Sequence, residues 1–255
     1  TDDKVGVKKD EFEIKISVDK DSRTIVISDN GIGMTAEELE NNLGTIANSG
    51  SFKFKNENKL EEDVDIIGQF GVGFYSAFMV AKEVTVRTKA YGGDKAYEWI
   101  SEGADGYQIG ECDKDTVGTE ITLKLKDDTD DEKYSEFLEQ YRIQSLVKKY
   151  SDYIRFPIKM DMSKSRLKEG TENEYEDYIE TETLNSMVPI WRKNKSELKD
   201  EDYNSFYKEK FFDYTDPLLH IHTKTEGTAT YNALLYIPSK APYDYYSKDY
   251  EKGLQ

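Results

Sequence analysis

A chain of 255 residues is long enough for one or two domains with substantial cores. Its 52 acidic and 35 basic residues give a formal net charge of −17, which disfavours nucleic acid as a partner because a polyphosphate backbone would be repelled. Charged residues make up 34% of the chain, as in many disordered segments, but 19 Tyr, 11 Phe and 2 Trp indicate packed cores.

The cysteine count and the apolar stretches limit where in the cell the protein can be expected. Cys112 is the single cysteine, so neither an intrachain disulfide nor a cysteine-based metal cluster can form. The longest apolar stretch, 70–81, is too short to cross a bilayer, which predicts no membrane partner. We therefore expect a cytoplasmic protein. Because the chain starts at Thr1 without Met and stops at Gln255 in mid-pattern, we also expect a fragment.

The first predicted elements are a β-hairpin and a helix. Residues 12–18 and 24–28 alternate between apolar and polar side chains around a charged turn, which predicts the hairpin. Thr35 and Glu38 have the spacing of a capping box, which predicts that a helix begins after Met34. The N-terminus of this helix should point back at Asp29.

A polar segment and a run of strands follow. Residues 48–65 are rich in Ser, Gly, Lys, Asn and Glu between glycine-rich ends, which predicts a mobile lid. A short apolar helix is expected at 74–81. Alternating patterns then predict further strands, at 84–88, 97–101, 107–110 and 119–125.

The remaining elements divide the chain into two domains. An amphipathic helix is predicted at 137–150 and the closing strand of the first domain at 153–160, so this domain should span 1–162. The polar residues 163–175 predict a charged linker or an exposed hairpin tip. Residues 176–255 should begin a second α/β domain, with a helix near 200–212 and a strand at 233–237.

Three glycine-containing segments carry the chemistry, at 29–33, 68–73 and 118–119. An aspartate that ends a buried strand can accept a hydrogen bond from an exocyclic amine such as that of adenine, and neighbouring glycines let the backbone approach a flat ring. The second segment offers N–H groups at a helix N-terminus, which favours phosphate. Taken alone, Asp29-Asn-Gly is typical of a turn, and the second segment lacks the context of a dinucleotide fingerprint.

Two other groups of side chains have alternative interpretations. His220 and His222 lie on one face of a predicted strand, but with no third ligand in sight they are better explained as ordinary strand residues than as metal ligands. The tyrosines near the C-terminus could offer an aromatic surface to a client protein, although packing is the commoner role of aromatic residues. These tyrosines are Tyr243, Tyr245, Tyr246 and Tyr250.

Longer strings resemble the ninety-kilodalton heat-shock chaperones, and most of all their bacterial branch. The strings nearest the N-terminus are Ser28-Asp-Asn-Gly-Ile-Gly-Met-Thr35, Asn42-Leu-Gly-Thr-Ile-Ala47 and Gly68-Gln-Phe-Gly-Val-Gly-Phe-Tyr-Ser-Ala77. The likeness continues to the end of the chain through Tyr150-Ser-Asp-Tyr153, Trp191-Arg-Lys-Asn-Lys-Ser196 and Leu235-Tyr-Ile-Pro-Ser239.

This resemblance implies a fold, an activity and partners. The fold is an α/β two-layer sandwich of the Bergerat ATP-binding type, followed by the beginning of a second α/β domain. The activity is that of an ATP-dependent chaperone that binds ATP or ADP and unfolded client proteins, dimeric as a whole protein and monomeric as this fragment. A sensor kinase or topoisomerase-like ATPase of the same fold is an alternative, as is an interaction scaffold that binds no nucleotide.

The resemblance also implies roles for individual residues. Asp29 should receive the adenine amine, with Gly33 and Thr119 helping through ordered water; Met34 should pack on the base and Asn42 should lie near the ribose and phosphates. The backbone N–H groups of Gly71, Val72, Gly73 and Phe74 should bind the phosphate chain. Gly44, Ser49, Gly50 and Gly68 should bound the lid, and Asn48 stands where relatives have lysine.

No catalytic residue and no metal ligand is assigned to this chain. In the resembled family, a helix that precedes the first hairpin supplies the general-base Glu and the Asn that binds Mg²⁺, and this chain begins after that helix. The family's arginine that meets the terminal phosphate should lie beyond Gln255. We therefore expect the fragment not to hydrolyse ATP.

Overall fold

The structure is a computed structural model that describes residues 9–44, 73–171, 173–225 and 231–241. Its contacts divide the chain into two compact units, Thr1–Met187 and Val188–Gln255. Several predictions lie outside the described residues: the lid at 48–65 with its bounding residues Ser49, Gly50 and Gly68, the phosphate-binding Gly71 and Val72, and the tyrosines from Tyr243 to Tyr250.

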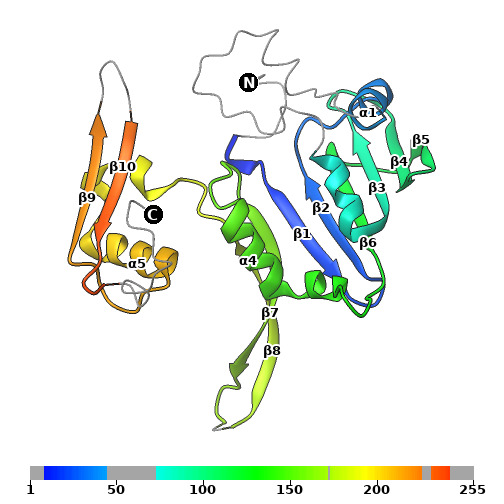
Figure 1. The fold of residues 1–255 in the computed structure, drawn as a ribbon. Helices are drawn as coiled ribbons and strands as arrows, with labels where there is room; N and C mark the ends of the chain where they lie inside the picture. Colours follow the sequence, from blue (N-terminus) through cyan, green and yellow to red (C-terminus); the bar gives the residue numbers. More distant parts are fainter. Residues whose placement is uncertain (1–8, 45–72, 172, 226–230, 242–255) are drawn as a thin grey trace. The chain divides into compact units, whose positions relative to one another are not determined.

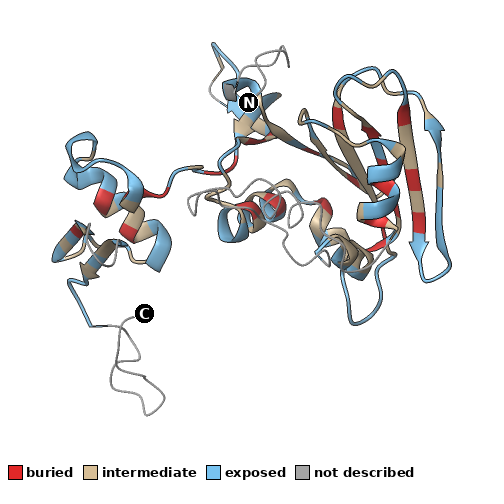
Figure 2. Cartoon of the chain, turned by 90° about the horizontal axis from the view of Figure 1, so that it is seen from above, coloured by how far each residue is buried: buried red, intermediate tan, exposed pale blue. Residues whose placement is uncertain are grey.

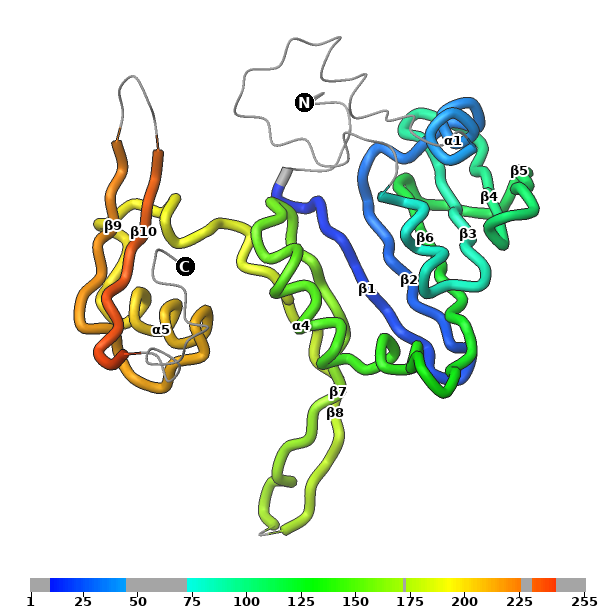
Figure 3. The backbone as a smooth tube through the Cα atoms, viewed as in Figure 1, coloured from blue at the N-terminus to red at the C-terminus, as the bar shows by residue number. Residues whose placement is uncertain are grey.

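An eight-stranded sheet in the order β5-β4-β3-β6-β2-β1-β7-β8 forms the first unit (Figure 1). Neighbouring strands are antiparallel, except that β1 and β7 are parallel. Figure 3 follows the chain through β1, which lies between β2 and β7. The strands are β1 (Ile14–Asp19), β2 (Thr24–Asp29), β3 (Ala81–Lys89), β4 (Ala96–Gly103), β5 (Gly106–Cys112), β6 (Gly118–Leu125), β7 (Ile158–Leu167) and β8 (Tyr175–Thr183).

Side-chain alternation gives this sheet one apolar and one polar face. Strand pairing places six residues in a row across the apolar face: Met160, Ile16, Ile27, Ile121, Val86 and Trp99. A neighbouring row on the other face is polar: Lys15, Ser28, Glu120, Arg87 and Glu98. Buried residues accordingly recur along β3 between more exposed ones. Figure 2 shows such changes between buried and exposed positions along strands of the sheet.

Helices cover the apolar face. Within the described residues of the first unit, the helices are α1 (Ala36–Leu43), α3 (Ala77–Val80) and α4 (Gln140–Tyr150), with 3₁₀ turns at Lys9–Glu11, Phe74–Ser76 and Tyr134–Leu138. Leu39 and Leu43 of α1 pack on β3 and β4, and Ile143 and Val147 of α4 pack on β1, β2 and β7. One helical layer on one sheet is the predicted two-layer α/β sandwich.

Strands β7 and β8 form a charged hairpin in the first unit. Strand β8 pairs with β7 along its length, and the facing side chains form ion pairs, for example between Lys164 and Glu180 and between Arg166 and Glu176. The contact-based division after Met187 keeps β8 in the same unit as β7, to which it is hydrogen-bonded. The domain limits 1–162, 163–175 and 176–255 stay a prediction.

The described part of the second unit, 188–225 and 231–241, combines one α-helix with a two-stranded sheet. Its elements are 3₁₀ turns at Ile190–Arg192 and Lys195–Glu197, then α5 (Asp200–Phe211), β9 (Leu219–Thr225) and β10 (Tyr231–Ile237). Strands β9 and β10 are antiparallel. Aromatic side chains join the two layers, since the rings of Phe206 and Tyr207 on α5 contact the ring of Tyr236 on β10.

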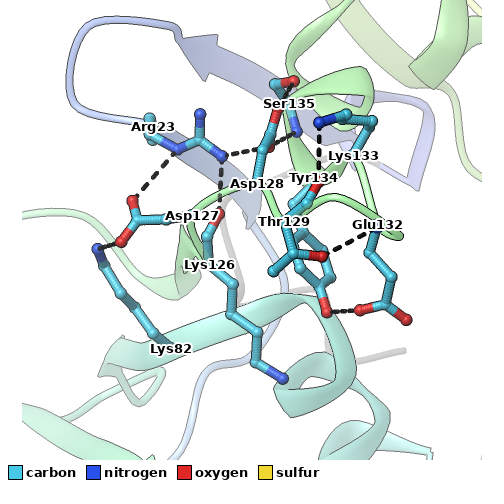
Figure 4. Close-up of polar contacts among 10 residues, drawn as sticks. All are labelled: Arg23, Lys82, Lys126, Asp127, Asp128, Thr129, Glu132, Lys133, Tyr134 and Ser135. Atoms are coloured by element: carbon cyan, nitrogen blue, oxygen red, sulfur yellow. Dashed lines mark hydrogen bonds and ion pairs between the residues drawn. The ribbon is translucent and has the colours of Figure 1, made fainter.

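A polar cluster fastens the β1–β2 turn to the loop after β6 (Figure 4). The Arg23 guanidinium donates to the carbonyl of Lys126 at 2.7 Å and to the Asp128 carboxylate at 2.9 Å. Asp128 also accepts hydrogen bonds from the backbone and hydroxyl of Ser135. Asp127 lies between the side chains of Arg23 and Lys82. The hydrogen bonds from Ser135, and then the one from Arg23, lower the pKa of Asp128 to about 2.

Asp128 is expected to contribute to acid unfolding. Its pKa is lower in the folded chain than the value of about 3.9 usual in unfolded chains, so its stabilising contribution is present above about pH 4 and is lost as the pH falls towards about 2. As the pH is lowered from about 4 to about 2, the melting temperature of Asp128→Asn should fall less than that of the wild type. Thermal unfolding at these two pH values measures the difference. Asp130→Asn, an exposed residue of the same loop, is the control. A wild-type pH dependence in Asp128→Asn would contradict the prediction.

Candidate adenine-nucleotide site

Three polar residues lie side by side on the apolar face of the sheet. The row next to the one described above contains Ile158, Ile14, Asp29, Thr119, Thr88 and Tyr97. Asp29, Thr119 and Thr88 are therefore direct neighbours on three adjacent strands, and they lie beside the apolar row that contains Ile27, Ile121 and Val86. Such a local change of chemistry favours a binding site.

The Asp29 carboxylate lies exposed at the end of β2. One of its oxygens accepts the N–H of Gly31 at 2.8 Å, the hydrogen bond of a turn. The neighbouring Asn30 is fixed on both sides, because its amide oxygen accepts the N–H of Glu13 and its amide nitrogen donates to the carbonyl of Glu11. A carboxylate can accept about four hydrogen bonds, so Asp29 retains capacity for a ligand donor.

A cleft of about 320 Å³ opens beside this carboxylate. Apolar side chains supply most of its walls, and the ring of Phe12 contacts that of Phe156 edge-on at 6.2 Å. The lining residues are Phe12, Glu13, Ile14, Ile27, Ser28, Asp29, Asn30, Gly31, Ile121 and Phe156. Apolar walls with a carboxylate at one end suit a flat ring that carries an amine.

The loop after Asp29 is fastened to the sheet by Thr88. The Thr88 side chain is fully buried, and its oxygen accepts the N–H of Met34 at 2.9 Å. The same oxygen lies 3.1 Å from the Thr119 hydroxyl oxygen and 3.3 Å from the carbonyl of Gly118. Thr88 was not among the predicted site residues, although the signal was present: it continues the inward-facing positions Val84 and Val86 with a hydroxyl.

Helix α1 begins where the capping box predicts. Thr35 accepts the N–H of Glu38 at 3.2 Å through its side chain, and the Glu38 carboxylate accepts the N–H of Thr35 at 2.8 Å. This start places Asn42 on the last turn, where its amide lies 3.8 Å from the Met34 sulfur. A series of contacts through Thr88 thus connects five predicted site residues, of which Asp29 lines the cleft: Asp29, Gly33, Met34, Asn42 and Thr119.

The predicted phosphate-binding segment is described only from Gly73 onward. Gly73 precedes the 3₁₀ turn, and its carbonyl accepts the hydroxyl of Ser76 at 2.6 Å. The Phe74 ring packs edge-on against the ring of Trp99 at 5.5 Å. The expected apolar helix at 74–81 is a 3₁₀ turn followed by the single turn of α3.

The two histidines are integrated into the second unit. His222 lies 2.8 Å from the Tyr203 hydroxyl through Nδ1 and 3.1 Å from the carbonyl of Trp191 through Nε2. Because a carbonyl only accepts, Nε2 carries the proton. The His220 ring stacks on the Tyr203 ring at 4.1 Å. Within the described ranges, no group of three or more His, Cys, Asp or Glu side chains is arranged to hold a metal ion.

Comparison with protein families covers nearly the whole chain. Residues 4–132 match the model described as "Histidine kinase-, DNA gyrase B-, and HSP90-like ATPase". Residues 136–178 and 164–255 match the model described as "Hsp90 protein". The chain belongs to the Hsp90 family. Its sheet with one helical layer is the ATPase fold of that family.

Relatives within the Hsp90 family match this chain over its whole length. The chain is 59% identical over 254 residues to "Chaperone protein HtpG" of Clostridium perfringens, 61% identical over 255 residues to that of Halalkalibacterium halodurans, and 59% identical over 255 residues to that of Bacillus subtilis. Each match covers 100% of this chain and 41% of the relative, so the chain spans about two fifths of their length. Among the helices that the structure describes, none has the length and apolar character needed to cross a membrane.

Proposed function

We propose that the first unit binds the adenine of ATP or ADP in the cleft at the end of β2, with Asp29 accepting the exocyclic amine. The observation that carries this proposal is the exposed Asp29 carboxylate at a cleft whose apolar walls include Ile27, Ile121 and Phe156. A flat apolar ring suits these walls, and an amine donor suits the carboxylate.

The neighbouring residues fit the rest of a nucleotide. The Thr119 hydroxyl, one strand from Asp29, and the backbone of Gly33 can hold a water beside the base. Met34 flanks the base, and Asn42 reaches towards the ribose and phosphates. Backbone N–H groups from Gly71 to Phe74 serve the phosphates. Magnesium would be bound chiefly through the phosphate oxygens.

For the whole protein we propose an ATP-dependent chaperone that acts on unfolded client proteins in the cytoplasm as a homodimer. The support is the printed name of its relatives, chaperone protein HtpG, and their identity along the entire chain. A sensor kinase or a topoisomerase-like ATPase would share the match at residues 4–132 but not the Hsp90 match that extends from 136 to 255.

Calorimetric titration of ADP into the chain and its Asp29→Asn variant tests the adenine proposal. The substitution replaces an acceptor with a mixed donor and acceptor, so the amine loses its charged partner. We expect a loss of about 1.5–3 kcal/mol in binding free energy, the range for hydrogen bonds to charged groups. Asp105→Asn makes the same chemical change in the exposed β4–β5 turn and should bind like the wild type.

Two results would count against the proposal. Equal affinities of the wild type and Asp29→Asn would show that the carboxylate does not contact the base. If no heat of binding were measured for the wild type or either variant, the result would favour the alternative of an interaction scaffold that binds no nucleotide.

A further inference from the structure

A buried asparagine holds the loop that forms one wall of the cleft. Asn185 follows β8 and is 5% exposed. Its amide oxygen accepts the N–H of Ile158 at 2.8 Å. Its amide nitrogen donates to the carbonyls of Ile154 at 2.9 Å and Phe156 at 3.0 Å. One side chain therefore satisfies three backbone groups within five consecutive residues.

The backbone around Asn185 reinforces this attachment. The N–H of Leu184 donates to the carbonyl of Ile158 at 2.8 Å, and the N–H groups of Ser186 and Met187 donate to the carbonyl of Asp152 at 3.0 and 2.8 Å. The segment Leu184–Met187 is thus bound along the 152–158 loop. Met187 is the last residue of the first unit.

The loop matters because of Phe156. This side chain lines the cleft that contains Asp29, and its ring contacts the ring of Phe12. Since Phe156 is 42% exposed, packing alone leaves its position poorly fixed. Instead, the hydrogen bond that Asn185 donates to the carbonyl of Phe156 fixes the backbone of Phe156.

We infer that Asn185 is a positioning residue for the adenine cleft: it holds the Ile154–Ile158 loop so that Phe156 forms a wall of the cleft beside Asp29. This inference rests on the proposed function of the cleft. It also makes nucleotide affinity depend on a segment that ends where the chain enters the second unit. Without the carboxamide, two carbonyls and one N–H lose Asn185 as a partner, and the loop responds by moving so that these groups reach water.

A double-mutant cycle on ADP affinity tests whether Asn185 acts through Phe156. Asn185→Ala should weaken ADP binding at least about tenfold, and Phe156→Leu about fivefold, at a temperature where each variant is folded by circular dichroism. In the Phe156→Leu background, Asn185→Ala should weaken ADP binding less than about threefold, because the ring that Asn185 positions is already absent. Val84→Ala, at a fully buried position four residues along β3 from Thr88, lowers the melting temperature but leaves the affinity unchanged.

A second readout needs no nucleotide. In the free protein, the nuclear Overhauser contact between the rings of Phe12 and Phe156 should vanish in Asn185→Ala and persist in Val84→Ala. Persistence of this contact in Asn185→Ala would overturn the inference, as would independent, additive effects of the two substitutions on affinity. Failure of the wild type to bind ADP would instead contradict the proposed function, and the ring contact would then decide the role of Asn185.

Discussion

Replacing Trp99 with alanine is expected to lower the free energy of unfolding of the first unit by about 3–5 kcal/mol, the range for deleting a large aromatic side chain from a core. Trp99 is 1% exposed. Its ring stacks on that of Tyr107 at 5.8 Å and meets the ring of Phe74 edge-on at 5.5 Å. It also belongs to the buried cluster that holds Leu39 of α1. Urea denaturation followed by far-UV circular dichroism measures this loss.

Trp99→Phe separates packing from hydrogen bonding. The indole N–H of Trp99 has no hydrogen-bond partner within the described ranges, so phenylalanine removes volume without removing a hydrogen bond. We expect a cost of about 1–2 kcal/mol, well below that of alanine, because most ring contacts are kept. If phenylalanine proved as costly as alanine, the contribution of Trp99 would not come from its packing.

Strands and helix starts were predictable because their signals are local. Alternation of apolar and polar residues marks β1 and β2, since a strand with one covered face buries every second side chain. The box of Thr35 and Glu38 marks the start of α1, because both partners lie within four residues. The position of Asp29 at the end of β2 follows from the same alternation.

The hairpin of β7 and β8 was harder to predict because its outer part lacks an apolar signal. Its strands are held by cross-strand ion pairs such as that between Lys168 and Glu174, and charged residues of this kind are also typical of linkers. Only the pairing of two segments separated in the sequence distinguishes these cases.

Two residues that organise the site were missed for a related reason. Thr88 contacts Met34 across 54 positions, and Asn185 contacts Phe156 across 29. Alternation along β3 shows that Thr88 faces inward, but the partners of a buried threonine or asparagine are set by strand register and loop path. Sequence patterns therefore gave the proposed ligand-facing residues, and the structure added Thr88 and Asn185, whose contacts lie far apart in the sequence.

Gly33→Ala is expected to destabilise the first unit by at least about 3 kcal/mol, through backbone strain and a steric clash together. Gly33 has a φ of +63°, in the left-handed region. An added Cβ would lie 1.9 Å from the carbonyl oxygen of Lys89. That carbonyl belongs to the end of β3, which pairs with β4 and β6, so no side-chain rotation relieves the clash. Thermal unfolding of the purified variant measures the loss.

Gly92→Ala is the matched control, because Gly92 also has a left-handed backbone, with a φ of +75°, but an added Cβ would meet no heavy atom within 4 Å. Its cost should be only that of the backbone conformation, about 1 kcal/mol. The difference in unfolding free energy between the two variants then measures the cost of the clash between the Gly33 loop and β3.

The close approach of this loop to β3 also brings the N–H of Met34 to Thr88. Gly33→Ala should therefore bind ADP more weakly than Gly92→Ala. Equal melting temperatures of the two variants would show that the loop moves away from β3 at little cost, and that glycine is not required there.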